Sequence, residues 1–217
     1  MKKKFHNDQH EFWSGKFGNQ YIDRNNNLNL ISSNIYLFVQ ALKKIDKIEN
    51  LIEFGANIGL NIKALKILFP NLDVHAVEIN SKACKQLTKL ISKKKIFNNP
   101  IEKFKVKKKF DLVLIKGVLI HINPKELKKV YKKLYYATKK YLLIVEYYNP
   151  DPISVKYRGH SEKLFKRDFA GDIIKSYSKM KLVDYGFVYR GDVNFPQDDL
   201  TWFLMEKKNV KKNEIKV

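Results

Sequence analysis

Two glycines and an acidic residue mark the part of the chain that could bind a ligand. Gly55 and Gly59 lie in the run Glu53–Asn61, between a strand-like apolar segment and a helix-like one. Glycines at such a turn let the backbone approach a ligand at the carboxyl ends of parallel strands. The spacing is Gly-x-x-x-Gly and not Gly-x-Gly-x-x-Gly. A dinucleotide-pyrophosphate site is therefore not indicated.

The acidic residue is Glu78, which ends the next strand-like segment, 23 residues after Gly55. A carboxylate at that position can accept hydrogen bonds from both hydroxyls of a ribose. Together the glycine loop and Glu78 predict a nucleoside ligand without a pyrophosphate. The alternative is a plain tight turn and a surface glutamate.

The elements that must position these residues alternate along the chain. Apolar side chains at helical spacing predict a helix over residues 30–45. Ser81 is expected to cap a later helix, and Pro124 to stand at the first position of another. After Pro150 we expect a loop over 150–167, a short helix over 168–177 and two adjacent strands. This order predicts an α/β, doubly wound, mostly parallel sheet with an antiparallel edge strand. The predicted strands are 50–54, 74–79, 110–115, 141–148, 181–189 and 200–207.

Composition narrows the class of protein. The 217 residues are 44% hydrophobic, which excludes a disordered chain, and no apolar run has the length of a membrane span. The single cysteine, Cys84, excludes an internal disulfide and a cysteine-based zinc site, and we expect no metal. No apolar segment follows the basic start as it would in a signal peptide, so a cytoplasmic location is expected.

The net charge of +21 suggests an anionic partner, but its composition weakens that interpretation. Only four of the 43 basic residues are Arg, at positions 24, 158, 167 and 190. Phosphate and base recognition favour the Arg fork. Lys and Asn share A-rich codons, so the charge is interpreted mainly as solvated faces, with attraction for anions as the alternative.

The glycine loop, Glu78 and the β/α order together resemble the class I S-adenosylmethionine (SAM) methyltransferases. The resemblance implies a Rossmann-like, seven-stranded sheet, SAM as cofactor and S-adenosylhomocysteine (SAH) as product. In that fold the glycine loop passes under the methionine and the ribose, and the acidic residue holds the ribose.

Further segments are similar to one particular family, the pseudaminic acid biosynthesis-associated methylases, which are SAM-dependent enzymes encoded with nonulosonic acid and flagellar glycan genes. The resemblance extends from about Glu11 to Lys207. It implies an N-terminal helical cap (1–29), a methyltransferase domain (30–207) and a basic tail expected to be disordered (208–217). The matching segments are Phe12–Asn25, Lys116–Pro124, Glu146–Pro150, Tyr157–His160, Lys163–Gly171 and Phe195–Asp199.

The resemblance also implies cofactor-binding roles. Arg24 would face the methionine carboxylate as a bidentate partner, or be a surface charge. Trp13 would fold over the cofactor, or anchor the N-terminal helix in the core. Asn99 falls near the place where adenine is usually held. The full predicted cofactor set is Trp13, Tyr21, Arg24, Glu53, Gly55, Asn57, Gly59, Asn61, Glu78, Asn99, Lys116, Gly117 and Val118.

For the chemistry we expect His121 to act as a base, because the pKa of an imidazole lies near working pH. A histidine that only hydrogen-bonds backbone is the alternative, and His160 competes for the role. The substrate-binding candidates are Tyr147, Tyr148, Arg158, His160 and Arg167, since an acidic acceptor needs such donors; a solvated basic loop is the other interpretation of this segment. Residues 197–199 form a turn or close over the acceptor.

The predicted function is methyl transfer from SAM to a small acidic acceptor, a sugar or nonulosonic acid intermediate of surface or flagellar glycan synthesis. We expect no specific nucleic acid and no membrane span as partner. The alternatives are a nucleic-acid methyltransferase and a non-catalytic SAM-binding protein. Against the first, Lys116-Gly117-Val118 stands where DNA amino-methylating enzymes carry an Asn/Asp-Pro-Pro-aromatic motif.

Overall fold

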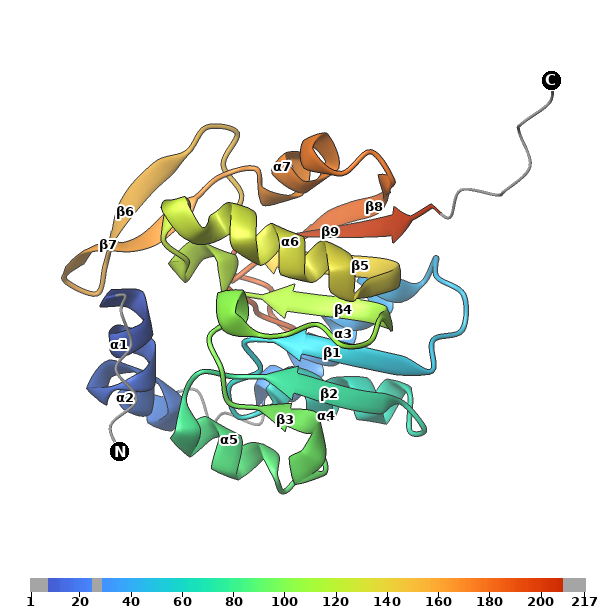
Figure 1. Cartoon of the computed structure of the whole chain (residues 1–217), viewed down its shortest axis with the longest axis horizontal. Coiled ribbons are helices and arrows are strands. Elements are labelled where there is room, and N and C mark those ends of the chain that lie inside the picture. Colours follow the sequence, from blue (N-terminus) through green and yellow to red (C-terminus); the bar gives the residue numbers. More distant parts are fainter. Residues whose placement is uncertain (1–7, 25–28, 209–217) are drawn as a thin grey trace.

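The computed structural model describes residues 8–24 and 29–208, which form a seven-stranded sheet with helices on both faces (Figure 1). The strand order is β3-β2-β1-β4-β5-β9-β8. The strands are β1 (Asn50–Phe54), β2 (Asp73–Val77), β3 (Ile96–Phe97), β4 (Phe110–Lys116), β5 (Thr138–Glu146), β8 (Met180–Val188) and β9 (Leu200–Lys207). The helices are α1 (Asp8–Ser14), α2 (Lys16–Arg24), α3 (Asn29–Leu42), α4 (Leu60–Leu68), α5 (Ser81–Leu87), α6 (Leu127–Ala137) and α7 (Phe169–Ser176), with short 3-10 turns η1 (Lys93–Lys95), η2 (Ile101–Lys103), η3 (Leu119–His121) and η4 (Pro124–Glu126).

The predicted fold class is confirmed. Strands β1 to β5 pair in parallel, and β9 runs antiparallel to both β5 and the edge strand β8. The parallel strands are nearly continuous apolar runs because helices cover both faces of the sheet. Within β4 the side chains of residues 112–115 are fully buried. An N-terminal pair of helices, α1 and α2, lies beside the carboxyl ends of the strands (Figure 1).

Side chains alternate between two apolar cores, one on each face of the sheet. Leu112 and Leu143 belong to the core beneath α3 and α4, whereas their neighbours Val113 and Leu142 belong to the core beneath α6 and α7. The alternation follows from the twofold period of a strand. It also determines which side of the ligand site each strand-end residue faces.

Two local predictions are wrong. Residues 150–167 are not a loop, because β6 (Ile153–Tyr157) and β7 (His160–Lys166) form an antiparallel hairpin. Its two turn residues, Arg158 and Gly159, both have positive φ (47° and 86°), as the commonest two-residue hairpin turns require. Pro124 stands at the start of helical structure as predicted, in the 3-10 turn η4 that leads directly into α6.

The second concerns the start of α5, which is capped by Asn80 and not by Ser81. The Asn80 side chain accepts hydrogen bonds from the backbone N–H groups of Lys82 and Ala83. Its amide also donates to the backbone oxygen of Trp13 (3.1 Å) and to the side chain of Asn19 (3.0 Å). One residue therefore joins the N-terminal helices to the body of the protein.

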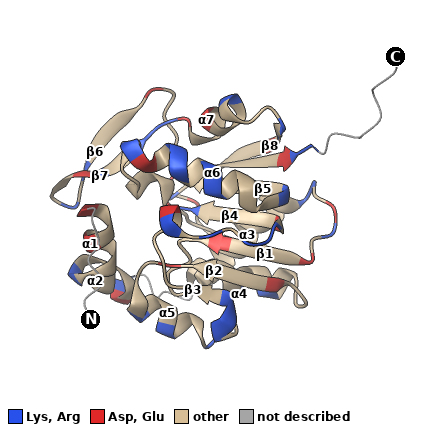
Figure 2. Ribbon diagram, viewed as in Figure 1, with Lys and Arg blue, Asp and Glu red and all other residues tan. Residues whose placement is uncertain are grey.

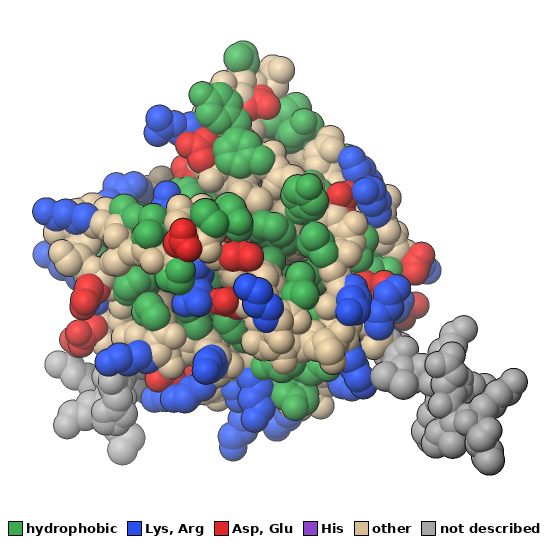
Figure 3. Space-filling view, turned by 90° about the horizontal axis from the view of Figure 1, so that it is seen from above, with side chains coloured by type: hydrophobic (Ala, Val, Ile, Leu, Met, Phe, Trp, Pro, Cys, Tyr) green, Lys and Arg blue, Asp and Glu red, His purple; other side chains and the backbone are tan. Residues whose placement is uncertain are grey.

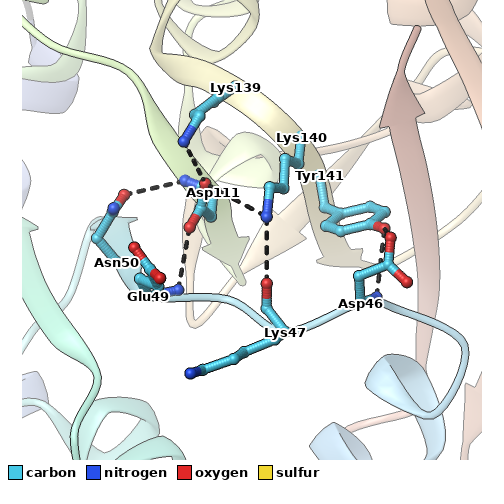
Figure 4. A network of polar contacts seen from close by, with 8 residues as sticks. All are labelled: Asp46, Lys47, Glu49, Asn50, Asp111, Lys139, Lys140 and Tyr141. Carbon is cyan, nitrogen blue, oxygen red and sulfur yellow. Dashed lines mark hydrogen bonds and ion pairs between the residues drawn. The ribbon is translucent and has the colours of Figure 1, made fainter.

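The opposite, amino-terminal edge of the sheet carries a polar network centred on Asp111 (Figure 4). Asp111 accepts the backbone N–H of Glu49 (3.0 Å) and pairs with the ammonium of Lys139 (3.1 Å), and its own N–H donates to Asn50 (3.0 Å). Lys140 lies 3.9 Å from the same carboxylate. These partners lower the pKa of Asp111, although its desolvation acts in the other direction.

The surface is basic without a single basic stripe. Lys and Arg are distributed over helices and loops, with Asp and Glu among them (Figure 2). On the face seen in Figure 3, hydrophobic side chains gather over the middle and most basic side chains lie toward the margins. None of the helices in the described part of the chain combines the length and apolar character that a bilayer crossing needs. The predicted basic tail lies outside the described residues except for Lys208.

Candidate active site

A cavity of about 450 Å³ opens at the carboxyl ends of β1, β2 and β4, where α1 and α2 also contribute to the wall. Ligands of doubly wound sheets bind at this edge, next to the point where the strand order reverses. The predicted site residues in its wall are Trp13, Tyr21, Gly55, Asn57, Asn61, Glu78, Asn99, Lys116, Gly117, Val118 and His121. Most of the predicted cofactor set is thus brought together in one place.

The glycine loop forms the floor of this cavity. Gly55 has φ +80°, and a Cβ atom there would lie 2.4 Å from a methyl carbon of Val118. Gly55 N–H donates to the oxygen of Val77 (2.8 Å), which extends the parallel pairing of β1 and β2 into the loop. Any other side chain at position 55 would be both strained and overlapped. Gly59 also has positive φ, but its missing Cβ faces Leu87 and Leu90 and not the cavity.

Glu78 lies in the wall beside this loop and is 7% exposed. One carboxylate oxygen accepts the N–H of Asn57 and the other the N–H of Asn80, both at 2.7 Å. Burial raises the pKa of Glu78, and these backbone donors oppose the rise. A carboxylate offers about four lone-pair sites. Each oxygen therefore retains capacity for a ligand hydroxyl.

Glu53 lies beneath the cavity and not in its wall. It is fully buried, and one of its oxygens accepts a hydrogen bond from the amide of Asn61 (2.6 Å). The other oxygen has no partner among the described residues. Burial raises the pKa of Glu53 to about 8. Glu53 thus orients Asn61, which does line the cavity.

Lys116 ends β4 and faces the cavity. Its ammonium forms no hydrogen bond and no ion pair with any residue that the structure describes. Burial lowers the pKa of Lys116, and the carboxylates of Glu53, Asp198 and Glu146 act against that shift. The site thus contains a partly desolvated cation whose counter-charges lie nearby without touching it.

Glu146, the last residue of β5, is a site component that we did not predict. One of its oxygens accepts the N–H groups of Val118 (2.9 Å) and Leu119 (2.8 Å). Burial raises its pKa to about 7, and the backbone donors oppose this. Glu146 fixes the turn that carries Gly117 and Val118 into the cavity wall. The available signal was an acidic residue at the carboxyl end of a buried strand.

His121 reaches the cavity wall from η3. Its Nδ1 lies 2.7 Å from the backbone oxygen of Lys163, so Nδ1 donates and Nε2 is left as an acceptor. The ring also packs against Trp13 and Tyr157, with centroids 4.5 and 5.0 Å away. Burial lowers the pKa of His121 to about 4. The expectation that its pKa lies near working pH is therefore wrong.

Aromatic side chains of the N-terminal helices cover one side of the cavity. Trp13 and Tyr21 meet edge to face at 5.4 Å, and both line the wall. The indole Nε1 of Trp13 has no hydrogen-bond partner in the described part of the chain. Burial raises the pKa of Tyr21 well above its ordinary value. Both groups are placed to exclude water from a ligand.

Other predicted residues do not line the cavity. Arg24 is exposed and lies over the ring of Phe17 (5.3 Å). Arg158 is exposed at the tip of the β6–β7 hairpin. Arg167 forms an ion pair with Asp172 at 2.7 Å, in the first turn of α7. Three of the four arginines are thus engaged or exposed outside the wall.

The remaining predicted residues lie around the hairpin. His160 packs against Phe12, with ring centroids 5.1 Å apart. Tyr148 is 44% exposed, whereas Tyr147 is half-buried beneath the ammonium of Lys166 (4.8 Å). These side chains lie outside the wall of the cavity.

Several wall residues come from segments that sequence reasoning left open or did not consider. Gln197 and Asp198 line the cavity, which agrees with closure over a ligand. Gln197 donates to the side chain of Asn34 on α3 (2.8 Å), and His10 forms an ion pair with Glu102 across the site. The sequence does not predict these two contacts, because each joins residues that are far apart in the chain.

Comparisons with known proteins agree with this geometry. Residues 52–142 match the family model described as a methyltransferase domain. A search of curated proteins finds no significant match. The matched range begins in β1 and ends in β5, and so contains the glycine loop, Glu78 and Lys116.

Solved structures show the same fold at low sequence identity. The Burkholderia thailandensis 1,6-didemethyltoxoflavin-N1-methyltransferase has a TM-score of 0.67 at 12% identity, covering 95% of this chain and 93% of that one. The plantazolicin methyltransferase BpumL has 0.63 at 13%, covering 92% and 95%. The N-methyltransferase NodS from Bradyrhizobium japonicum WM9 has 0.60 at 13%, covering 88% and 98%.

The cavity also meets the physical requirements of a nucleoside cofactor. Its volume falls within the range of small-molecule sites, roughly 300–1,000 Å³. Gly55 lines the cavity with backbone alone, packed against Val118, and Glu78 has unused acceptor capacity in the same wall. The predicted fold is confirmed by these structures, and the match of residues 52–142 to a methyltransferase domain supports the predicted enzyme class.

Proposed function

We propose that this protein transfers the methyl group of SAM to a small acidic acceptor, a sugar or nonulosonic acid intermediate of surface or flagellar glycan synthesis. One observation supports SAM as the cofactor. Gly55, which has no side chain, and Glu78, whose oxygens can accept further hydrogen bonds, lie in the wall of the same cavity. The acceptor half is supported by the family resemblance of the segments between residues 11 and 207. Similar structures hold small molecules, including 1,6-didemethyltoxoflavin together with SAH.

The residues of the wall divide the binding task. Glu78 would hold the ribose hydroxyls, and Asn99 would lie beside the adenine. Trp13 and Tyr21 would exclude water, which strengthens every polar contact inside the site. When bound, SAM supplies an electrophilic methyl group. The protein's contribution is to align that group with the acceptor atom, an effect that can amount to about 7–11 kcal/mol.

On the acceptor side, His121 is the residue we assign to the reacting O–H or N–H. Its Nε2 can accept a hydrogen bond because Nδ1 is occupied by the Lys163 oxygen. With a pKa of about 4 the imidazole is neutral at physiological pH and holds a proton weakly. His121 would therefore orient the acceptor and not retain its proton.

A basic cluster away from the cavity argues against a nucleic-acid substrate. Lysines 107–109 precede β4, and Lys132 and Lys133 lie in the middle of α6; together they line a separate hollow. Residues 107–109 lie at the amino-terminal end of β4, whereas the cavity is at its carboxyl end. A strand bound to this cluster would not present a base to His121.

Calorimetry with SAH tests the cofactor half. Glu78→Ala should weaken SAH by about 2–4 kcal/mol, since it removes two charged hydrogen-bond acceptors. Glu126→Ala, which changes a carboxylate outside the cavity wall, is the matched control. Equal SAH affinity in wild type and Glu78→Ala would reject the placement. For the acceptor, mass spectrometry of nonulosonic acids and their nucleotide-activated forms incubated with SAM should show a gain of one methyl group.

A further inference from the structure

Two buried carboxamides of the cavity wall are joined to each other and have no assigned role. Asn34 on α3 and Gln197 in the segment between β8 and β9 both line the cavity. The Nε2 of Gln197 donates a hydrogen bond to the Oδ1 of Asn34 at 2.8 Å. This bond leaves the amide nitrogen of Asn34 and the amide oxygen of Gln197 for other partners.

The protein itself provides no such partners. The Asn34 Nδ2 and the Gln197 Oε1 form no hydrogen bond with any residue that the structure describes. The two residues are only 3% and 5% exposed, yet both atoms remain accessible. Because both residues line the cavity, the two atoms are available to a ligand inside it. Polar groups in such a closed site cost free energy until a ligand pairs with them.

The pair lies on the acceptor side of the cavity. In the strand order β3-β2-β1-β4-β5-β9-β8, Asn99 follows β3 and Glu78 follows β2. The proposed adenine and ribose contacts are therefore at one end of this order. The segment that carries Gln197 joins β8 to β9, at the other end. Gln197 thus reaches the cavity from the side opposite the nucleoside.

Contacts around the pair hold it in position. The ring of Tyr36 on α3 stacks on that of Phe195, with centroids 4.8 Å apart and planes 9° apart. The backbone N–H of Gln197 donates to the oxygen of Tyr189 (3.2 Å), and the Asp192 side chain accepts the N–H of Phe195 (2.8 Å). A ligand therefore meets two amides that are already in place, which lowers the entropy cost of binding.

The pair offers one donor and one acceptor, close together and without charge. Turning both amides over would exchange the two roles and offer the same set. A carboxylate presents only acceptors and an ammonium only donors, so neither matches both atoms. A trans secondary amide presents both, but its N–H and C=O point in opposite directions. A hydroxyl donates and accepts, and it rotates to suit its neighbours.

We propose that Asn34 and Gln197 bind hydroxyl groups of the methyl acceptor, and so select a polyhydroxylated, sugar-like molecule over a planar aromatic one. The inference rests on the proposed function and names the residues that choose its acceptor. One hydroxyl, or two on adjacent carbons, accepts from the Asn34 amide and donates to the Gln197 oxygen. The pair positions the acceptor and takes no part in the chemistry.

Steady-state kinetics with SAM and nonulosonic acids, free and as cytidine monophosphate conjugates, test the assignment. Asn34→Leu and Gln197→Met each remove one member of the pair and add no charge. Each should raise the KM of the acceptor about 10- to 100-fold, because a polar group is left unpaired. The kcat and the affinity for SAH should stay near wild type. Gln40→Met, the same kind of change on α3 but outside the cavity wall, should alter none of these values.

The double variant separates a binding role from a structural one. Each single variant leaves a buried amide without its partner, so it should also lower the urea midpoint of unfolding. Combining Asn34→Leu with Gln197→Met removes both partners, and the midpoint should return toward wild type. The KM of the acceptor should nevertheless stay at least as high as in the single variants. If the double variant recovers both the midpoint and the KM, the pair only joins α3 to the segment before β9, and the proposal is overturned.

The same measurements distinguish failure of this inference from failure of the proposed function. If wild type methylates none of these acceptors, the proposed acceptor is wrong and the subsite is rejected with it. If wild type methylates one of them and the variants keep its KM, only the assignment to Asn34 and Gln197 is wrong. A double variant that loses SAH affinity while its urea midpoint matches wild type would place the pair on the cofactor and contradict the proposal.

Discussion

The two edges of the central sheet treat buried carboxylates in opposite ways. At the amino-terminal edge, Asp111 pairs with Lys139 and accepts the N–H of Glu49, and its pKa is lowered (Figure 4). At the carboxyl edge, burial raises the pKa of Glu53 to about 8 and of Glu146 to about 7. One oxygen of each of the three carboxylates lacks a hydrogen bond among the described residues, but that of Asp111 lies 3.1 Å from the Lys139 ammonium, whereas those of Glu53 and Glu146 have no ion-pair partner there.

The difference separates a structural edge from a functional one. Charges that are fully paired stabilise the fold, whereas under-satisfied titratable groups cluster at ligand sites. The contacts at the amino-terminal edge thus hold structural elements together. The carboxyl edge retains carboxylate oxygens without hydrogen bonds in the described residues. Substitutions on the two edges should therefore affect different measurements.

Gly55→Ala should have the largest effect and should act on both stability and binding. The new Cβ would meet Val118 at 2.4 Å, and the backbone has positive φ. Strain and overlap together should lower the free energy of unfolding by about 2–4 kcal/mol. SAH binding should be lost in calorimetry. Gly159→Ala is the control, because Gly159 also has positive φ but open space around it. If Gly159→Ala lost as much stability and SAH affinity as Gly55→Ala, the effect would not depend on the position of Gly55 in the cavity wall.

Asp111→Asn should destabilise the protein and leave the ligand site intact. The variant loses the charge that pairs with Lys139, so the free energy of unfolding in urea should fall by about 1–3 kcal/mol. Because the folded pKa of Asp111 is lowered, its contribution is present above the unfolded pKa and is lost as pH falls through the folded value. SAH affinity should match wild type. A variant that loses SAH affinity while folded would contradict the separation of the two edges.

Glu146→Gln should give the opposite pH dependence. Glu146 has a raised folded pKa, so the folded protein binds more protons than the unfolded chain between about pH 4.5 and its folded pKa of about 7. Wild-type stability should therefore fall as pH rises through that window. The amide keeps an acceptor for the Val118 N–H but does not titrate. Urea unfolding at pH 5, 6, 7 and 8 should show a shallower decline in the variant, by roughly 1–2 kcal/mol across the window. Parallel profiles would show that Glu146 is not the titrating group.

Arg158→Lys should have the smallest effect, because Arg158 lies exposed at the hairpin tip and outside the cavity wall. Surface substitutions of this kind usually stay within about 0.5 kcal/mol in stability. SAH affinity by calorimetry should also be unchanged. A loss of SAH affinity would place the hairpin over the site and enlarge the functional edge.

Sequence patterns predicted the sheet because its signals are local. The apolar run of β4 and the glycine loop identify themselves within a few residues, and Glu78 follows from its place at a strand end. The hairpin was missed because its exposed strands alternate weakly and its turn begins with Arg158, which is not a usual residue at positive φ.

The site was less predictable because burial and pairing depend on distant contacts. His121 has its low pKa because α1 and the hairpin enclose it through Trp13 and Tyr157, which no spacing reveals. Arg167 looked available for a ligand until the fold placed Asp172 beside it. Scarcity of a residue type was therefore a poor guide to which residues line the cavity, and position at a strand end was a better one.

Asn80 makes ligand binding and the ordering of the N-terminus thermodynamically inseparable. Its backbone N–H holds Glu78, while its side chain holds α1 and α2 through Trp13 and Asn19. A ligand that fixes Glu78 also fixes the residue to which these helices are tied. Local opening of residues 8–24 then costs the free energy of ligand release in addition to its own. Amide hydrogens of α1 and α2 should accordingly exchange more slowly with SAH present. Their exchange rates would then report how much of the protein has ligand bound.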